Sequence, residues 1–271
     1  MKTNRNEKAF RGWLESKKYA RSTVKHHLQN IGYLDNPEKM RYEDLINYVG
    51  SLQGKVKPQT INRRLSSIKV YYDYLVEKGE VRVNIARSLE VKNEKKVLIP
   101  ILKEKELEEL YINYPDRTYY ELRKKILLGL VIYQAVDLTT VQLLKGEHIA
   151  LDKGEIYLPS TKRSNSRKLS LKGSQMLPIY RYLEHNPEGN LFLGRVGNIY
   201  HELLQELKKH NRKVESIRQL RRSVITNWLK TYNLREVQYY AGHRYISSTE
   251  KYRRVDLEAM KSDLKKYHLL G

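Results

Sequence analysis

The chain has 271 residues, of which 40% are hydrophobic, so it is long enough for two domains with a core in each. It contains no cysteine, which excludes disulfides, thiolate metal sites and cysteine nucleophiles and fits a reducing compartment. Because 52 lysines and arginines stand against 31 aspartates and glutamates, the net charge is +21 and a polyanion is the natural partner. A lysine-rich proteome with a solvated surface is the alternative explanation of this charge.

The sequence predicts no membrane segment. Residues 1–5 lead into no apolar stretch of the kind that a signal peptide contains, and no run of about 18 apolar residues occurs anywhere. No strongly amphipathic basic helix indicates binding to a membrane surface. We therefore expect a cytoplasmic, nucleoid-associated protein without a membrane partner.

The N-terminal part begins with two predicted helices. Residues 5–17 place Phe10, Trp13 and Leu14 on one apolar stripe. Ser22 is predicted as the N-cap of a second helix, and the Asn-Pro pair at 36–37 breaks the helical pattern that follows.

Two more helices are predicted next, at residues 42–52 and 57–79. In the second of these the apolar side chains recur every three or four positions, as on one face of a helix. Gly79 stands where helices commonly end.

A charged stretch without helical periodicity, residues 88–101, has the composition of a linker between domains. Helices are predicted to resume at about Lys103, whereas residues 154–171 predict two short strands around a polar, basic turn. From Gly173 the helical pattern returns. The predicted fold class is therefore mainly α with a small β-sheet, an α+β fold.

Residues 216–230 predict an amphipathic helix with two arginines beside its apolar side. Because positions three apart are neighbours on a helix, Arg218 and Arg221 can reach one point together. Two guanidiniums that converge match the oxygens of a phosphate. A solvated basic face is the alternative interpretation.

A Gly-His pair and a tyrosine follow this helix in a specific order. His243 comes 22 residues after Arg221, and Tyr252 comes nine residues after His243. This arrangement resembles the tyrosine recombinase or phage integrase family, in which an HxxR box and a GH box precede a nucleophilic tyrosine. The resemblance extends over nearly the whole chain, and TKRSNSRKLSL, at 161–171, is similar to the family's β-hairpin, whose lysine matches Lys162.

The resemblance implies a domain organisation. Residues 1–90 would form a helical core-binding domain, 91–101 a linker and 102–271 the catalytic domain, closing as a C-shaped clamp around double-stranded DNA. The side chains expected to contact DNA are Arg63, Arg64, Lys69, Arg222 and Arg244.

The resemblance also implies a chemistry. In the family the tyrosine attacks a scissile phosphate, giving a 3′-phosphotyrosyl link and a free 5′-hydroxyl, and neither ATP nor a metal is required. The catalytic residues expected here, without any cofactor, are Lys162, Arg218, Arg221, His243 and Tyr252. Lys162 would protonate the leaving oxygen, and His243 would serve as the base or cation that Tyr252 needs.

Two positions depart from the family pattern. Asp137 stands where the family has its first catalytic arginine, and Arg218 stands at the histidine position of the HxxR box. An active enzyme would need another cation, with Arg218 best placed and Arg123 or Lys125 next. We also expect the Asp137 carboxylate to face Arg218 as a buried ion pair.

Three functions remain open on the sequence alone. The first is a site-specific recombinase, whose integration, excision, resolution or inversion reactions share one chemistry. The second is a catalytically impaired DNA-binding relative with an accessory or regulatory role in recombination. The third is a type IB topoisomerase. The short C-terminal helix at 256–271 is evidence against it. This helix resembles the recombinase segment that docks on a neighbouring protomer in a tetrameric synapse.

Overall fold

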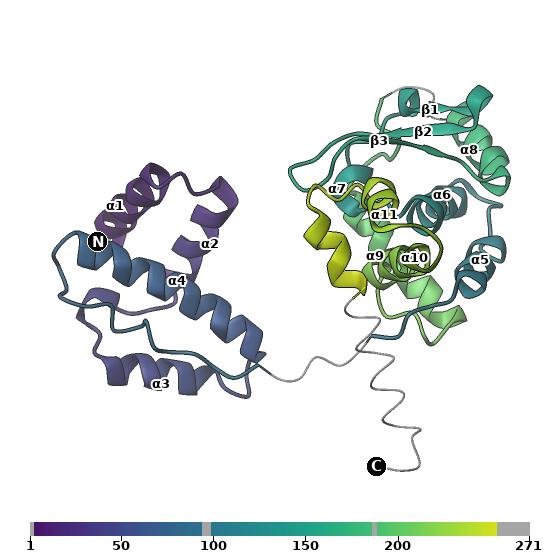
Figure 1. Cartoon of the computed structure of the whole chain (residues 1–271). Coiled ribbons are helices and arrows are strands. Elements are labelled where there is room, and N and C mark those ends of the chain that lie inside the picture. Colours follow the sequence, from purple (N-terminus) through teal and green to yellow (C-terminus); the bar gives the residue numbers. More distant parts are fainter. Residues whose placement is uncertain (1–2, 94–98, 186–188, 254–271) are drawn as a thin grey trace, which may run out of the picture. The chain divides into compact units, whose positions relative to one another are not determined.

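The computed structural model describes residues 3–93, 99–185 and 189–253. The chain divides into two compact units, Met1–Val97 and Leu98–Gly271 (Figure 1). Each has a hydrophobic core of its own. Both units are mainly helical, and the second also holds a small antiparallel sheet. The predicted α+β fold class is therefore confirmed.

The described part of the first unit is built around one long helix, α4. Its elements are α1 (Thr3–Ser16), α2 (Arg21–Ile31), the 3-10 helix η1 (Pro37–Lys39), α3 (Tyr42–Leu52) and α4 (Pro58–Glu77). Leu65 of α4 belongs to one buried cluster with Phe10 of α1 and Leu45 of α3. Gly79 follows α4 with a left-handed φ of 76°, so the predicted helix end is confirmed.

The predicted N-cap of the second helix is wrong. Ser22 lies inside α2, and the N-cap is Ala20, whose backbone is extended and whose side chain makes no capping bond. The first helical hydrogen bond runs from Val24 N to Ala20 O at 3.0 Å. Burial of Val24 and Leu28 against the core fixes where the helix begins, and this burial prevails over the capping preference of serine.

The described part of the second unit is built around α6. Its helices as far as Ala241 are α5 (Glu104–Ile112), α6 (Tyr119–Gln134), α7 (Leu138–Val141), η2 (Gly146–His148), η3 (Leu151–Lys153), α8 (Gly173–His185), α9 (Val196–His210), α10 (Ile217–Thr231) and α11 (Leu234–Ala241). Helix α6 packs against α5, α8, α9 and α10. Because it has neighbours on several sides, α6 is apolar around most of its circumference. Its fully buried side chains include Leu127, Leu128, Leu130 and Val131.

In the described residues the sheet has one more strand than the two predicted. Its strands are β1 (Ile149–Ala150), β2 (Glu155–Leu158) and β3 (Arg167–Ser170), antiparallel in the order β1-β2-β3. The predicted pair corresponds to β2 and β3, which enclose the polar turn. Strand β1 is only two residues long, so it leaves no alternation in the sequence by which it could be recognised.

Several chain segments end close together in the second unit. Ala135, whose φ of 47° is left-handed, is the C-cap of α6, and Asp137 is the N-cap of α7. Residues 246–253, the last that the structure describes, are helical and carry Tyr252. None of the helices in the described part of the chain is long and apolar enough to cross a membrane.

Candidate active site

Arg221 joins three segments of the second unit. Its Nε donates to the carbonyl of Ala135 at 2.6 Å, and its Nη2 donates to that of Ala241 at 3.0 Å. Its Nη1 lies 3.5 Å from the hydroxyl oxygen of Tyr252. A guanidinium has five N–H groups, so two remain for a ligand. Ser216 caps α10 by accepting a hydrogen bond from Gln219 N, which fixes the start of the helix that carries Arg221.

His243 packs directly against Tyr252. The two rings are stacked, with centroids 5.5 Å apart and planes 20° from parallel. His243 is buried, and its Nδ1 shares a hydrogen bond of 2.9 Å with the hydroxyl of Thr249. Burial, followed by the charges of Arg221 and Arg167, lowers the pKa of His243 to about 4. The imidazole is therefore neutral near pH 7.

Arg167 is a buried cation that was not predicted from the sequence. It is 3% exposed, its Nε donates to Tyr240 O at 2.7 Å, and within the described residues its two terminal nitrogens have no hydrogen-bond partner. Burial, followed by the charge of Arg221, lowers its pKa to about 10, so the guanidinium stays protonated at neutral pH. The sequence feature that could have revealed this buried arginine is its position on the inward face of β3, where a charged residue is unusual.

Asp137 does not pair with Arg218. Its Oδ1 accepts hydrogen bonds from the backbone N–H groups of Thr139 and Thr140, at 2.9 and 3.0 Å, and its Oδ2 accepts one from the Thr140 hydroxyl at 3.2 Å. Across residues 99–185 and 189–253, no ion pair joins Asp137 to Arg218, so the predicted pair is wrong. The short side chain turns back to cap α7, while Arg218 is exposed.

The turn that carries Lys162 is fastened beside the Gly-His pair. Asn165 N donates to the carbonyl of Gly242 at 2.9 Å, and Ser164 forms a β-bridge with His243. Arg244 Nη2 donates to Thr161 O at 3.2 Å. Lys162 itself is exposed on this turn.

Other predicted cations are engaged elsewhere or remain at the surface. Lys125 pairs with Asp116 at 3.2 Å, and Arg123 lies over the ring of Tyr120 at 5.5 Å. Neither contact belongs to the cluster of Arg167, Arg221, His243 and Tyr252. Arg222 is half-buried.

The three basic residues of α4 do not share one face. Successive helical residues are about 100° apart around the axis, so Arg63, Arg64 and Lys69 point in three directions. Arg63 is exposed, whereas Arg64 and Lys69 are half-buried. Arg64 lies over the ring of Tyr33 at 4.3 Å and donates to the Tyr48 hydroxyl at 3.4 Å.

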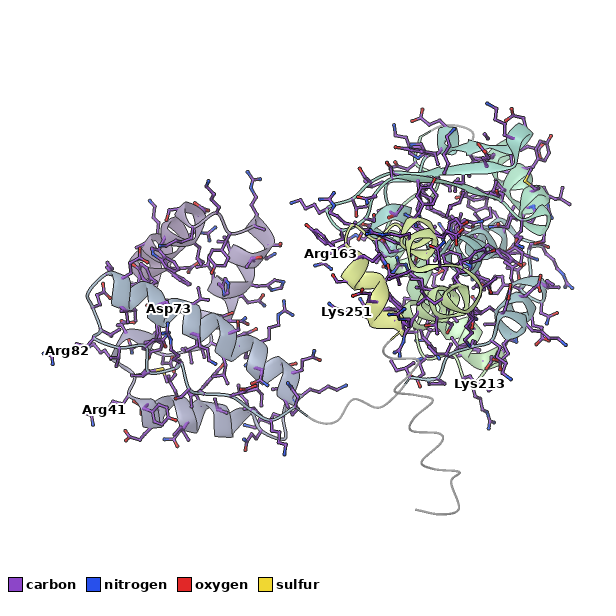
Figure 2. The ribbon with its side chains drawn as sticks, in the orientation of Figure 1. Arg41, Asp73, Arg82, Arg163, Lys213 and Lys251 are labelled. Atoms are coloured by element: carbon purple, nitrogen blue, oxygen red, sulfur yellow. The ribbon has the colours of Figure 1, made fainter. Side chains whose placement is uncertain are left out.

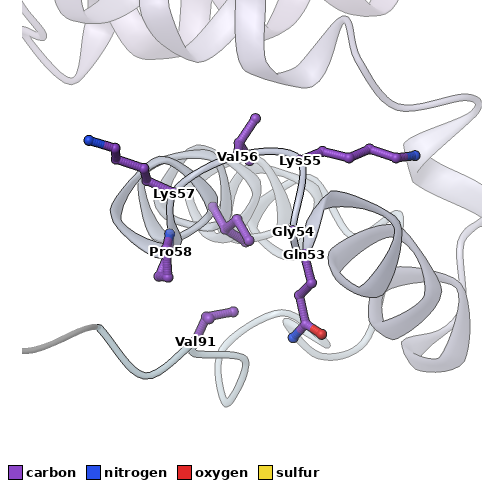
Figure 3. Close-up of a pocket in the computed structure, with 8 residues that line it drawn as sticks. Gln53, Gly54, Lys55, Val56, Lys57, Pro58 and Val91 are labelled. Atoms are coloured by element: carbon purple, nitrogen blue, oxygen red, sulfur yellow. The ribbon is translucent and has the colours of Figure 1, made fainter.

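Charged side chains cover both units (Figure 2). Arg163 and Lys251 are exposed on the second unit, and Arg41 and Arg82 are exposed on the first. A pocket of the first unit lies where α4 begins, and Figure 3 shows Lys55 and Lys57 at its edge pointing away from each other. In the described ranges, no group of three or more histidine, aspartate or glutamate side chains could hold a metal ion.

Comparison with known proteins identifies the family. Residues 100–258 match the Phage integrase family. Tyrosine recombinase XerC of Vibrio campbellii is 27% identical over 262 residues, covering 87% of this chain and 79% of that protein. A lambda integrase dimer bound to a COC′ core site has a similar fold, with a TM-score of 0.69 and 14% identity over 92% of this chain and 76% of that one.

A second solved structure has the same fold. The Tn1549 transposon integrase in complex with a circular intermediate DNA has a TM-score of 0.68 and 13% identity, covering 94% of this chain and 99% of that one. The family match spans more than half of the chain and includes Arg221, His243 and Tyr252. The chain therefore belongs to the phage integrase family of tyrosine-type site-specific DNA recombinases.

Proposed function

We propose that this recombinase cuts and rejoins DNA with Tyr252 as its nucleophile. The Tyr252 oxygen attacks the scissile phosphorus and its hydroxyl proton passes to water, while the bond from phosphorus to the 5′-oxygen breaks and a 3′-phosphotyrosyl link forms. A 5′-hydroxyl then attacks this link, reforms the DNA backbone and releases the tyrosine. The observation that carries the proposal is the contact of 3.5 Å between Arg221 Nη1 and the Tyr252 hydroxyl.

Arg221 and His243 have distinct parts in this proposal. The two unused N–H groups of Arg221 donate to the non-bridging phosphate oxygens, where negative charge grows in the transition state. The neutral ring of His243 holds Tyr252 in place by stacking. In the tautomer in which Nδ1 accepts from Thr249, Nε2 carries the proton and donates to a phosphate oxygen.

Three further cations complete the proposed site. Lys162 protonates the leaving 5′-oxygen. Arg167, buried beneath the Gly-His pair, contributes positive charge without touching the phosphate. Arg218, exposed on α10 one turn before Arg221, contacts a phosphate of the DNA backbone.

The two units divide the binding of DNA. We assign residues 1–90 to a core-binding domain, 91–101 to the linker and 102–271 to the catalytic domain, and the boundary at Val97 and Leu98 supports this division. Double-stranded DNA is the partner of both, and the lambda integrase relative is a dimer on its core site. Self-association would use 256–271, which lies outside the described residues, and would give a tetrameric synapse in the cytoplasm.

The first experiment identifies the DNA and then traps the intermediate. DNA that co-purifies with the chain is sequenced, and a duplex carrying the recovered site is nicked next to the expected cleavage position. Because the short strand diffuses away after cleavage, the phosphotyrosyl adduct accumulates and shifts the protein on a denaturing gel. We expect an adduct with the wild-type chain and none with Tyr252→Phe.

The matched control is Tyr245→Phe, because Tyr245 is 68% exposed and lies seven positions before the nucleophile. This variant should form the adduct at the wild-type rate. An adduct that persists in Tyr252→Phe would disprove the nucleophile. Tight DNA binding without any adduct would favour the accessory, non-catalytic relative.

A further inference from the structure

A line of hydroxyl groups runs from Asp137 to the turn that carries Lys162. Thr140 Oγ1 lies 3.2 Å from Asp137 Oδ2, and Ser164 Oγ lies 3.4 Å from Thr140 Oγ1. Thr161 Oγ1 lies 2.9 Å from Ser164 Oγ. Thr140 and Ser164 are buried, at 0% and 3% exposure, so water does not compete for these groups.

The carboxylate fixes the direction of every bond in this line. An ionised carboxylate only accepts, and each hydroxyl has a single proton. Thr140 therefore donates to Asp137, Ser164 donates to Thr140, and Thr161 donates to Ser164.

The line ends by holding the turn itself. Thr161 Oγ1 accepts hydrogen bonds from the backbone N–H groups of Arg163 and Ser164, at 3.1 and 3.0 Å, and Thr161 N donates to Ser164 O at 2.9 Å. These bonds close the turn 161–164 around Lys162. Because the Thr161 hydroxyl donates its hydrogen bond to Ser164, the lone pairs of its oxygen are free to accept hydrogen bonds from both backbone N–H groups.

We propose that Asp137 is a positioning residue that holds Lys162 for proton transfer through the hydroxyls of Thr140, Ser164 and Thr161. The proposal rests on the proposed function, in which Lys162 protonates the leaving oxygen. An arginine side chain at position 137 could only donate hydrogen bonds, so it could not accept the one that the Thr140 hydroxyl donates. Asp137, which replaces the family's arginine, would therefore contribute to the reaction by positioning Lys162.

The test separates proton donation from the other steps of cleavage. Replacing the bridging 5′-oxygen of the scissile phosphate by sulfur gives a thiolate leaving group, which departs without being protonated. Single-turnover cleavage of the oxygen and sulfur duplexes is measured for the wild type, Asp137→Asn, Ser164→Ala and Lys162→Ala. Asparagine caps a helix about as well as aspartate, so Asp137→Asn keeps the start of α7.

We expect Asp137→Asn and Ser164→Ala to cleave the oxygen duplex at least about tenfold more slowly than the wild type, which is part of the factor of about 10² to 10⁴ that general acid catalysis contributes. Both should regain most of the wild-type rate on the sulfur duplex, as Lys162→Ala should. The control Thr139→Ala should match the wild type on both duplexes, because Thr139 is exposed and uses only its backbone N–H. Equal slowing on both duplexes, or no slowing, would overturn the proposal.

A second measurement does not require activity. Trypsin cleavage after Lys162 and Arg163, followed by mass spectrometry, reports how firmly the turn is held. Asp137→Asn and Ser164→Ala should be cut there faster than the wild type and Thr139→Ala, and equal rates would overturn the proposal. If the wild type forms no adduct with either duplex, the proposed function fails instead, and the trypsin result still decides whether Asp137 holds the turn.

Discussion

Arg167 lies directly beneath Gly242: a Cβ built on Gly242 would stand 2.2 Å from Arg167 Nη1. Gly242 also has a left-handed φ of 69°. The glycine of the Gly-His pair thus gives the chain both its turn and the space for a buried guanidinium.

Gly242→Ala should therefore lower the free energy of unfolding by more than a matched glycine substitution does. The control is Gly154→Ala, because Gly154 has a similar φ of 63° but open space around its Cα. The left-handed backbone costs about 1 to 2 kcal/mol in both variants, and only Gly242→Ala adds the collision with Arg167. Urea unfolding measures the difference, and equal losses in the two variants would contradict the close approach.

Replacing Arg167 should slow adduct formation and leave the free energy of unfolding nearly unchanged. Arg167→Met removes a buried charge, which offsets the lost bond to Tyr240 O, so the free energy of unfolding should change by less than about 2 kcal/mol. Adduct formation should fall, because the site loses a fixed positive charge that stabilises the negative charge growing on the phosphate. Lys168→Met is the control, since Lys168 is exposed on β3, and it should change neither quantity. A wild-type rate for Arg167→Met would show that its charge is not used.

Stability should depend on pH through His243. Its pKa is about 4 in the folded protein against 6.5 as the ordinary value, so between these pH values the unfolded chain binds a proton that the folded chain does not. The folded state therefore loses stability as pH falls from 6.5 to 4, by a total on the order of 3 kcal/mol. Urea unfolding of the wild type and His243→Gln at several pH values isolates this loss. Parallel pH curves for the two proteins would contradict it.

DNA binding should weaken steeply with salt, because log K falls by about 0.9 for each phosphate neutralised. Arg218→Ala and Arg63→Ala should each lower this slope by about 0.9 if the side chain contacts a phosphate. Lys213→Ala is the control, because Lys213 pairs with Glu106 at 2.6 Å. Fluorescence anisotropy between about 50 and 200 mM salt measures the slopes. An unchanged slope would remove that arginine from the DNA interface.

The helices and the spacing of the reactive residues follow from local sequence. Apolar periodicity predicted a helix at 57–79, which is α4 (Pro58–Glu77), and the order of Arg221, His243 and Tyr252 indicated the family. The periodicity depends on residues a few positions apart, where helical geometry repeats, and the family pattern depends on residue types at fixed spacings within residues 221–252. Such patterns do not predict which distant segments of the chain contact each other in the fold.

Only the tertiary structure decided the surroundings of those residues. Arg167 becomes a buried part of the site because β3 packs beside α11, and its bond to Tyr240 O joins residues 73 positions apart. Asp137 turned to the open N–H groups of α7 and the Thr140 hydroxyl, which lie nearer than Arg218 on the surface of α10. The sequence determined which groups could react, and long-range packing determined which charges and hydroxyls lie beside them, because burial and hydrogen-bond partners depend on contacts across the fold.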